Sequence, residues 1–167
     1  YRCMNTPDWP MEYISQGCYK LSGYTDQDFY HHKLTWGDLI HEEDRERVWE
    51  EVSESLLKKI PFEIEYRITH RNGLHRWVWE KGCGVFGDKG EVIAIEGFIT
   101  DVTQRRVTED ALKESMKNYR ELIDGMNETV WVIDFNGKIL DVNRTATQIL
   151  GYTKEELFAL GLPGIDS

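Results

Sequence analysis

An internal repeat limits what this chain can fold into more than any other feature of its sequence. The segment LSGYTDQDF, from Leu21 to Phe29, recurs as ILGYTKEEL from Ile149 to Leu157, a displacement of 128 positions (Gly151 minus Gly23). At the same displacement, Tyr13-Ile14-Ser15 aligns with Asp141-Val142-Asn143. Similarity at a fixed displacement predicts one structural unit present twice. We therefore expect one complete module, a connector and the first part of a second copy.

Charge and hydropathy exclude several classes of partner. The net charge is −10 and the pI is about 5.0, so nucleic acid and anionic membrane surfaces would repel the chain. No apolar run is long enough to span a bilayer, and we find no secretory leader pattern. We expect neither nucleic acid nor membrane contact for this segment. With 167 residues, 40% of them hydrophobic, the chain is long enough to bury a core.

The three cysteines, Cys3, Cys18 and Cys83, are far apart and form no metal-ligand spacing. An odd number of isolated cysteines favours neither a disulfide framework nor a structural zinc site. We therefore expect a reducing, cytoplasmic compartment. The chain begins without an initiator methionine and stops within the second copy, so we also expect it to be a piece of a longer protein.

Three consecutive strands follow a long helix in the first module. The helix is predicted over Glu42 to Ile60, because apolar residues recur there every three or four positions. Phe62 to Arg71 alternates between apolar and polar residues, as a half-buried strand does. Asn72-Gly73 predicts a two-residue hairpin. That turn would place Ile68 opposite Trp77 and Tyr66 opposite Trp79, although a slip of one residue would exchange the faces.

The last strand of the first module is predicted over Val92 to Thr103, after a turn at Gly87 to Gly90. It would bring Phe98 close to Trp79 and Asp101 close to Arg76. Two strands and short helices precede the long helix, and two further strands and a helix follow the connector. The order predicts an α+β fold with a five-stranded antiparallel sheet and helices on one face.

After Thr103 the apolar period changes from two residues to between three and four. The spacing is that of a heptad seam over about two heptads. The seam comprises Leu112, Met116, Tyr119, Ile123 and Met126. A helix this short is marginal alone, so the connector needs a partner chain or a domain surface. We place the complete first module at residues 1–103, the amphipathic connector helix at 104–125 and the partial second module at 126–167.

The element order and six local sequences together resemble the PAS family, in its subgroup with a C-terminal Asp-Val-Thr motif. The six are Gly23-Tyr24-Thr25, Ile40-His41-Glu42-Glu43-Asp44-Arg45, Glu65-Tyr66-Arg67-Ile68, Asn72-Gly73, Arg76-Trp77-Val78 and Asp101-Val102-Thr103. Glu42 departs from the proline usual in the family, and both residues suit the first turn of a helix. The resemblance covers the whole chain, although the second copy has only the first half of the pattern.

The resemblance implies signal transduction, in which a change in the domain passes through the last strand into a helix leading to an output domain. We assign the relay to Arg76, Asp101 and Thr103, with Asp101 pairing with Arg76 and capping the connector. The alternative is a structural salt bridge and cap without a switching role.

The sequence gives little support for a bound flavin or haem cofactor. Nothing matches the reactive-cysteine helix of flavin-binding members, and the long helix lacks the axial histidine of haem-binding members. We expect no metal ligand among His31, His32, His41, His70 and His75. A pocket between the sheet and the long helix could be lined by Trp49, Val52, Tyr66, Trp77, Trp79 and Phe98. A filled aromatic core is the favoured alternative, so the expected cofactor is unknown or none.

No catalytic motif occurs in the chain, and we expect no enzyme activity within it. Three functions stay open. The first is a sensory and dimerisation module of a sensor histidine kinase in a two-component system. The second is a flavin- or haem-bearing sensor, and the third is the regulatory part of a diguanylate cyclase or transcriptional regulator. A small-molecule ligand is compatible with all three.

Two surfaces are expected to make contacts beyond the single chain. The partial second module would expose strand edges and an apolar helix face, and could borrow pairing from another chain. The predicted outer sheet face carries Val78, Ile93, Ile95 and Ile99 beside Glu65 and Arg67. A homodimer through this face or through the connector helix is therefore expected.

Overall fold

The structure, a computed structural model, describes residues 1–30 and 34–161. These residues form two compact units, Tyr1–Val107 and Thr108–Ser167. His31 and His32, two of the histidines for which no metal-ligand role was expected, fall outside the described residues. Within the described ranges, no helix has the length and apolar character needed to cross a membrane.

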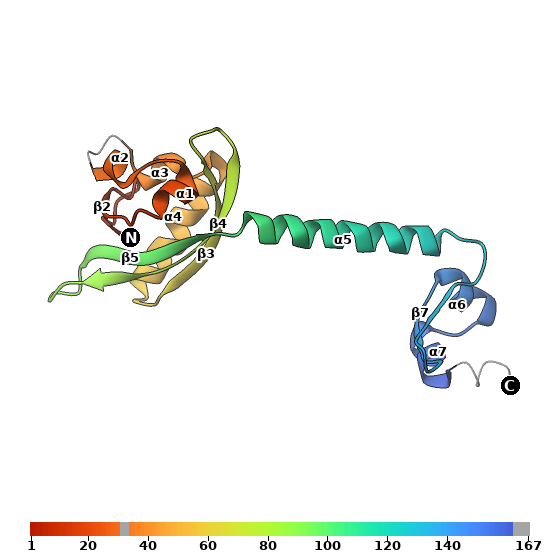
Figure 1. Ribbon diagram of the computed structural model, residues 1–167. Coiled ribbons are helices and arrows are strands. Elements are labelled where there is room, and N and C mark those ends of the chain that lie inside the picture. The colour runs from red at the N-terminus through yellow and green to blue at the C-terminus, as the bar shows by residue number, and fades with distance from the viewer. Residues whose placement is uncertain (31–33, 162–167) are drawn as a thin grey trace. The chain divides into compact units, whose positions relative to one another are not determined.

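The first unit is built on a five-stranded antiparallel sheet in the order β2-β1-β5-β4-β3. The strands are β1 (Arg2–Cys3), β2 (Met11–Tyr13), β3 (Phe62–Thr69), β4 (His75–Phe86) and β5 (Val92–Asp101). Four helices, α1 to α4, gather on one side of this sheet (Figure 1). The predicted α+β fold is confirmed.

The four helices are α1 (Cys18–Ser22), α2 (Asp26–Tyr30), α3 (Trp36–Leu39) and α4 (Glu42–Leu57). The sequence prediction missed α3, although Thr35 and Asp38 form a capping box at its start. It also placed the end of α4 at Ile60, three residues too late. The helix stops because Lys59 adopts a left-handed conformation with φ of 56°.

The core lies between α4 and the inner face of the sheet. Val48, Val52 and Leu56 on α4 recur at four-residue intervals and are all buried. They pack in one cluster with the alternate residues Phe62, Ile64, Tyr66 and Ile68 of β3. The residues that pack here are thus the ones predicted from the apolar spacing, every three or four positions in the helix and every second position in the strand.

The hairpin between β3 and β4 differs by one residue from its prediction. The backbone amide of His70 donates to the carbonyl of Leu74, and that of Gly73 donates to the carbonyl of His70. Only Gly73 has a positive φ, at 84°, so the loop has three residues and ends in a left-handed glycine instead of being a two-residue turn. The extra residue shifts the register.

This shift moves two tryptophans to the other side of the sheet. Tyr66 pairs with Val78 and Ile68 with Arg76, and not with Trp79 and Trp77 as predicted. Trp77 and Trp79 therefore lie on the outer face, together with Phe98, whose ring centroid is 5.3 Å from that of Trp79. Throughout, the outer face means the side of the sheet that carries these three rings.

The predicted composition of the outer face is wrong for its apolar residues for the same reason, whereas Glu65 and Arg67 do lie there, paired with Trp79 and Trp77. Val78 and Ile95 are fully buried on the inner side, and Ile99 packs partly buried against the core. Ile93 is exposed beside the irregularity in the β4–β5 pairing.

An ion pair joins the start of α4 to β3. The Arg67 guanidinium donates to both carboxylate oxygens of Asp44 at 2.9 Å, and the Arg67 backbone amide donates to the same carboxylate. Asp44 is buried, whereas Glu43, which also accepts from Arg67, is exposed. The Arg67 hydrogen bonds hold the pKa of Asp44 at about 2, below its ordinary value of 3.8.

The second unit contains most of the helix α5 (Thr103–Asp124), whose first turn belongs to the first unit. After α5 come β6 (Trp131–Ile133), β7 (Ile139–Val142), α6 (Arg144–Leu150) and α7 (Lys154–Leu160). The β6–β7 pair forms a two-stranded sheet. A small core of Ile139, Val142, Ala146 and Leu157 holds the unit together.

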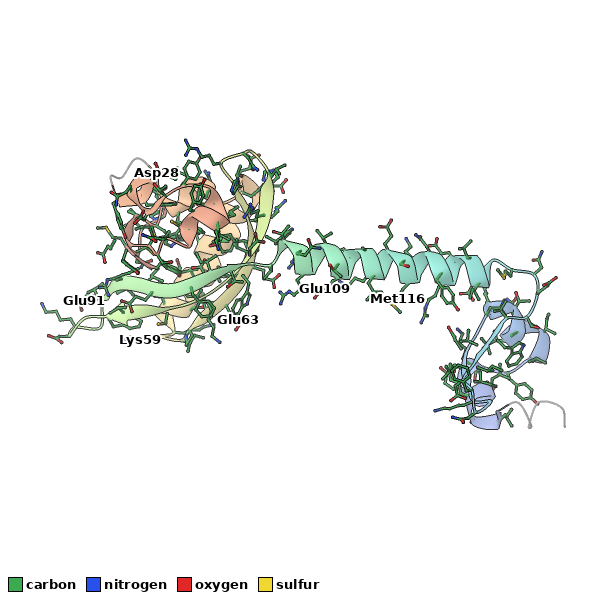
Figure 2. The ribbon with its side chains drawn as sticks, in the orientation of Figure 1. Asp28, Lys59, Glu63, Glu91, Glu109 and Met116 are labelled. Atoms are coloured by element: carbon green, nitrogen blue, oxygen red, sulfur yellow. The ribbon has the colours of Figure 1, made fainter. Side chains whose placement is uncertain are left out.

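The seam of α5 is largely exposed. Leu112, Met116, Tyr119 and Met126 are between 47% and 61% exposed, and Ile123 is partly buried. Figure 2 shows the Met116 side chain projecting from the helix. An exposed apolar seam at heptad spacing is a surface without an intramolecular partner among the described residues.

Candidate functional site

A groove of about 420 Å³ lies between α1 and the end of β5. Its lining comprises Tyr1, Ile14, Ser15, Gly17, Cys18, Lys20, Leu21, Trp36, Phe98, Ile99, Thr100 and Asp101. Apolar side chains predominate, with hydroxyl, ammonium and carboxylate groups among them. This combination and volume are typical of sites for small organic molecules.

The groove is not the pocket predicted from the sequence. Of the six residues expected to line that pocket, Val52 and Tyr66 are buried in the core, and Trp49 packs against it. Trp77 and Trp79 face the opposite side of the sheet because of the hairpin register. Only Phe98 reaches the groove. The remaining space between α4 and the sheet is about 10 Å³, roughly the room for one water molecule.

A buried hydrogen-bond network occupies the interior beside the groove. The hydroxyls of Tyr1 and Tyr66 donate to the two carboxylate oxygens of Glu80. The Trp36 indole Nε1 donates to the Tyr66 hydroxyl at 2.7 Å. Burial raises the pKa of Glu80, and it raises the pKa of Tyr66 well above its ordinary value. Tyr1 and Trp36 also line the groove, so they separate it from the buried carboxylate.

The structure brings the three predicted relay residues together. The Arg76 guanidinium donates to the Asp101 carboxylate at 3.3 Å and to the backbone carbonyl of Lys20 on α1 at 2.6 Å. The other oxygen of Asp101 accepts from the backbone amide of Thr103, the first residue of α5, at 2.9 Å. Thr103 Oγ1 in turn accepts from the Trp77 backbone amide at 2.9 Å. A continuous set of polar contacts thus connects the groove wall to the start of α5.

A second set of contacts on the outer face holds the first turn of α5. Glu65 on β3 accepts hydrogen bonds from Arg105 and from Arg106, with Arg106 Nε at 2.7 Å. The Arg106 guanidinium also lies 4.0 Å from the centroid of the Trp77 ring. We call Glu65, Trp77, Arg105 and Arg106 the outer clamp.

The outer clamp was not predicted from the sequence. Glu65 and Trp77 were assigned to strands and to two of the local family motifs, with no contact predicted between them, and the arginines lie 40 or more positions after Glu65. The alternating charge along β3 and the paired Arg105-Arg106 directly after the last strand were the available signals. These signals predict the clamp only in the observed strand register, which places Trp77 on the same face as Glu65.

Replacing Glu65 with glutamine tests the outer clamp. The side chain keeps its shape but loses its charge, so both arginines lose a charge-assisted hydrogen bond. Because the arginines are partly exposed, we expect a loss of only about 0.5–1 kcal/mol in the free energy of unfolding. Chemical denaturation at low and high salt measures the difference, which should shrink at high salt. Glu50→Gln on α4 is the matched control, because the exposed Glu50 side chain makes no ion pair within residues 1–30 and 34–161. An equal effect in both variants would contradict the clamp.

The described histidines show no ligand arrangement. His41 caps α4, with its Nδ1 accepting from the Glu43 amide. Its ring lies 4.7 Å from that of His75, which contacts Thr69. His70 accepts from the Asn72 amide within the hairpin loop. In the ranges that the structure describes, no three histidine, cysteine or acidic residues are grouped to hold a metal ion.

Comparison with known proteins identifies related sequences for both units. A profile described as the PAS fold matches residues 11–99, and one described as a PAS domain matches residues 117–167. A methyl sulfide methyltransferase-associated sensor of Methanosarcina acetivorans is 30% identical over 120 residues, covering 71% of this chain and 12% of that protein. A probable diguanylate cyclase of Escherichia coli is 31% identical over 128 residues, which cover 77% of this chain and 11% of that protein.

A solved structure is similar to the chain in both sequence and fold. It is a sensory box histidine kinase/response regulator from Burkholderia thailandensis, 33% identical, with a TM-score of 0.54. The match covers 65% of this chain and 81% of that one. This chain spans only about a tenth of the length of the two curated relatives, 12% and 11%.

Proposed function

The chain belongs to the PAS family, with two PAS matches in tandem, and from this we propose that its first domain senses a small molecule and relays the event through α5. The observation that carries the proposal is the polar path from the groove to the helix. Lys20 and Asp101 are both groove-lining residues, and both contact Arg76. Asp101 also holds the first amide of α5.

The path gives a ligand a direct way to act on the helix. A molecule in the groove would touch α1 and β5, the two elements that Arg76 bridges. Any change in their separation alters the Arg76–Asp101 contact, and with it the acceptor for the Thr103 amide. A ligand can shift the helix only by the difference in its affinity for the two arrangements. Because Lys20 and Asp101 both line the groove and contact Arg76, a ligand there would have different affinities for the two arrangements.

For the output, our proposal is a sensor histidine kinase of a two-component system. Its support is the likeness to the Burkholderia thailandensis histidine kinase/response regulator. A diguanylate cyclase output is a second candidate, favoured by the Escherichia coli relative at 31% identity. In either case the domains proposed are a PAS domain at residues 1–103, the connector helix at 104–125 and the N-terminal part of a second PAS domain at 126–167. The proposed compartment is the cytoplasm.

The proposed assembly is a homodimer formed through the seam of α5, with the outer face as an additional contact. The seam presents apolar side chains at heptad spacing, which a second copy of the helix would cover in a coiled coil. On the outer face, Phe98 is half exposed next to Trp79. Sedimentation velocity of the chain measures the association state, and a monomer at every concentration would contradict this proposal.

Replacing Asp101 with asparagine tests the relay. The variant keeps an oxygen acceptor near Thr103 but loses the charge that holds Arg76. We expect amide exchange in residues 103–107 to rise about tenfold, as expected for the loss of about 1.4 kcal/mol of local stabilisation. Hydrogen–deuterium exchange with mass spectrometry measures this.

The matched control is Asp110→Asn, which removes a carboxylate further along α5 that makes only an exposed pair with Lys113. Unchanged exchange in residues 103–107 of the Asp101 variant would contradict the relay. Changes spread over the whole first domain would instead indicate a purely structural salt bridge.

A further inference from the structure

The second unit contains a fully buried amide that holds the end of α5. Asn143 is 1% exposed and lies between β7 and α6. Its Nδ2 donates to the carbonyls of Ile123 at 3.0 Å and Glu128 at 2.8 Å. Its Oδ1 accepts from the amides of Val130 and Ala146, both at 3.0 Å. Two donors and two lone pairs are all that an asparagine side chain offers, so every one is used.

The four partners belong to three different parts of the unit. The Ile123 carbonyl is in the last turn of α5, where carbonyls have no partner within the helix. Glu128 and Val130 lie in the connection to β6, and Ala146 is in the first turn of α6. One side chain therefore fixes the end of the connector, the entry to the sheet and the start of the next helix.

Two neighbouring contacts tie the same elements together. Asp124, the last residue of α5, accepts from the Arg144 backbone amide at 2.8 Å. The hydroxyl of Thr145 donates to the Met126 carbonyl at 2.7 Å. Both contacts are exposed, whereas the Asn143 side chain is buried. Since buried polar groups lose much more when they are left unpaired, Asn143 dominates this junction.

The first copy of the repeat lacks this residue. Position 15, which is 143 minus the displacement of 128, is Ser15. Ser15 is exposed in the groove wall, and a serine hydroxyl has one proton, so it cannot donate to two carbonyls at once. The two copies therefore differ at the position where one of them receives a helix.

We propose that Asn143 is the positioning residue that couples α5 to the second PAS domain, so that the helix end, β6 and α6 move as one body. A rotation or shift of α5 is then delivered to the second domain without loss in the connection. The role as a signal coupling rests on the proposed relay, whereas the rigid attachment itself does not.

Nuclear magnetic resonance of the chain tests the attachment with Asn143→Asp. The aspartate keeps the acceptor for Val130 and Ala146 but loses both donors, so α6 keeps its cap while the Ile123 and Glu128 carbonyls lose their bonds to residue 143. In the wild-type chain, residual dipolar couplings from residues 108–124 and from residues 131–160 should fit a single alignment tensor. In the variant we expect two tensors, and exchange at residues 125–129 about tenfold faster.

Asn143→Ser, which installs the residue of the first copy, should give the same separation of tensors. Thr147→Ala is the control, because its hydroxyl bonds only within α6, to the Arg144 carbonyl, and it should keep one tensor. A single tensor with wild-type exchange in Asn143→Asp overturns the proposal. So does unfolding of α6 in the aspartate variant, because it would make Asn143 a general stability residue.

These outcomes are separate from those of the Asp101 test. The couplings and exchange rates come from residues 108–160, and the relay test reads residues 103–107. If the Asp101 test fails while the wild-type couplings fit a single tensor, the attachment of α5 to the second domain remains as a structural feature. Failure of the attachment with an intact relay would place the signal's exit elsewhere on α5.

Discussion

Asp44→Ala is expected to lower the free energy of unfolding of the first domain by about 3–5 kcal/mol. The substitution removes the acceptor for the side chain and the backbone amide of Arg67. The remaining guanidinium would be left partly buried, with the exposed Glu43 as its ion-pair partner and the Trp77 ring 5.7 Å away. Urea denaturation followed by tryptophan fluorescence measures the loss.

Glu43→Ala is the matched control, because Glu43 also accepts from Arg67 but is 68% exposed. Exposed pairs contribute about 0–1 kcal/mol. Similar losses in the two variants would contradict the dominant role of the Asp44 pair.

The same pair predicts how stability depends on pH. Since the pKa of Asp44 is lowered from 3.8 to about 2 in the folded domain, the folded state binds the proton less readily than the unfolded state. The stabilisation is present above pH 3.8 and is lost as the pH falls towards 2. The loss should total about 2 kcal/mol, and Asp44→Ala should remove this part of the acid sensitivity.

Gly97→Ala should cost about 1–3 kcal/mol or more, because it overpacks the centre of the sheet. A Cβ at this position would lie 2.4 Å from the Lys81 carbonyl oxygen and 2.8 Å from the Gly82 Cα. Both atoms are backbone, so β4 and β5 would have to separate. Gly97 pairs with Gly82, and each glycine leaves room for the Tyr1 hydroxyl.

Thermal denaturation compares this variant with Gly17→Ala. A Cβ at Gly17 meets only the Ser15 hydroxyl at 3.4 Å, and the backbone there is right-handed helical. We expect a change within about 0.5 kcal/mol for Gly17→Ala. Equal melting temperatures for the Gly97 and Gly17 variants would contradict the close packing of β4 against β5.

Local periodicity predicted the elements well, and one turn decided on which face of the sheet Trp77 and Trp79 lie. The helix α4 and the strand β3 were predicted from apolar spacing, because burial on one face imposes that spacing. The β3–β4 hairpin was predicted as a two-residue turn. Asn72-Gly73 is compatible with both a two-residue and a three-residue loop, and only the packing of β4, with Val78 facing the core in place of Trp77 and Trp79, selects between them.

The candidate site was predictable only in part. Arg76, Asp101 and Thr103 lie close together whichever face Trp77 takes, since they join the ends of neighbouring strands to the helix that follows. The groove required knowledge of how α1 sits against β5, and no sequence period encodes that contact. The outer clamp and the Asn143 bonds depend on residues far apart in the sequence, which the pattern of one segment cannot connect.

The internal repeat has a more specific meaning after the structure is known. Both copies have a glycine in a left-handed conformation at the matching helix end, Gly23 with φ of 80° and Gly151 with φ of 74°. They differ where each meets the preceding segment, Ser15 in one and Asn143 in the other. We infer that the tandem arrangement couples a change in the first domain to the second.

A double-mutant cycle tests the central claim that groove occupancy acts on α5 through Asp101. Ser15→Phe places a ring in the groove as a covalent substitute for a ligand, and Asp101→Asn breaks the relay. Exchange at residues 103–107 is measured in the wild type, both single variants and the double variant. We predict that Ser15→Phe changes this exchange in the wild-type background and has no further effect when Asp101 is replaced. An equal effect of Ser15→Phe in both backgrounds, or none in either, would contradict the claim.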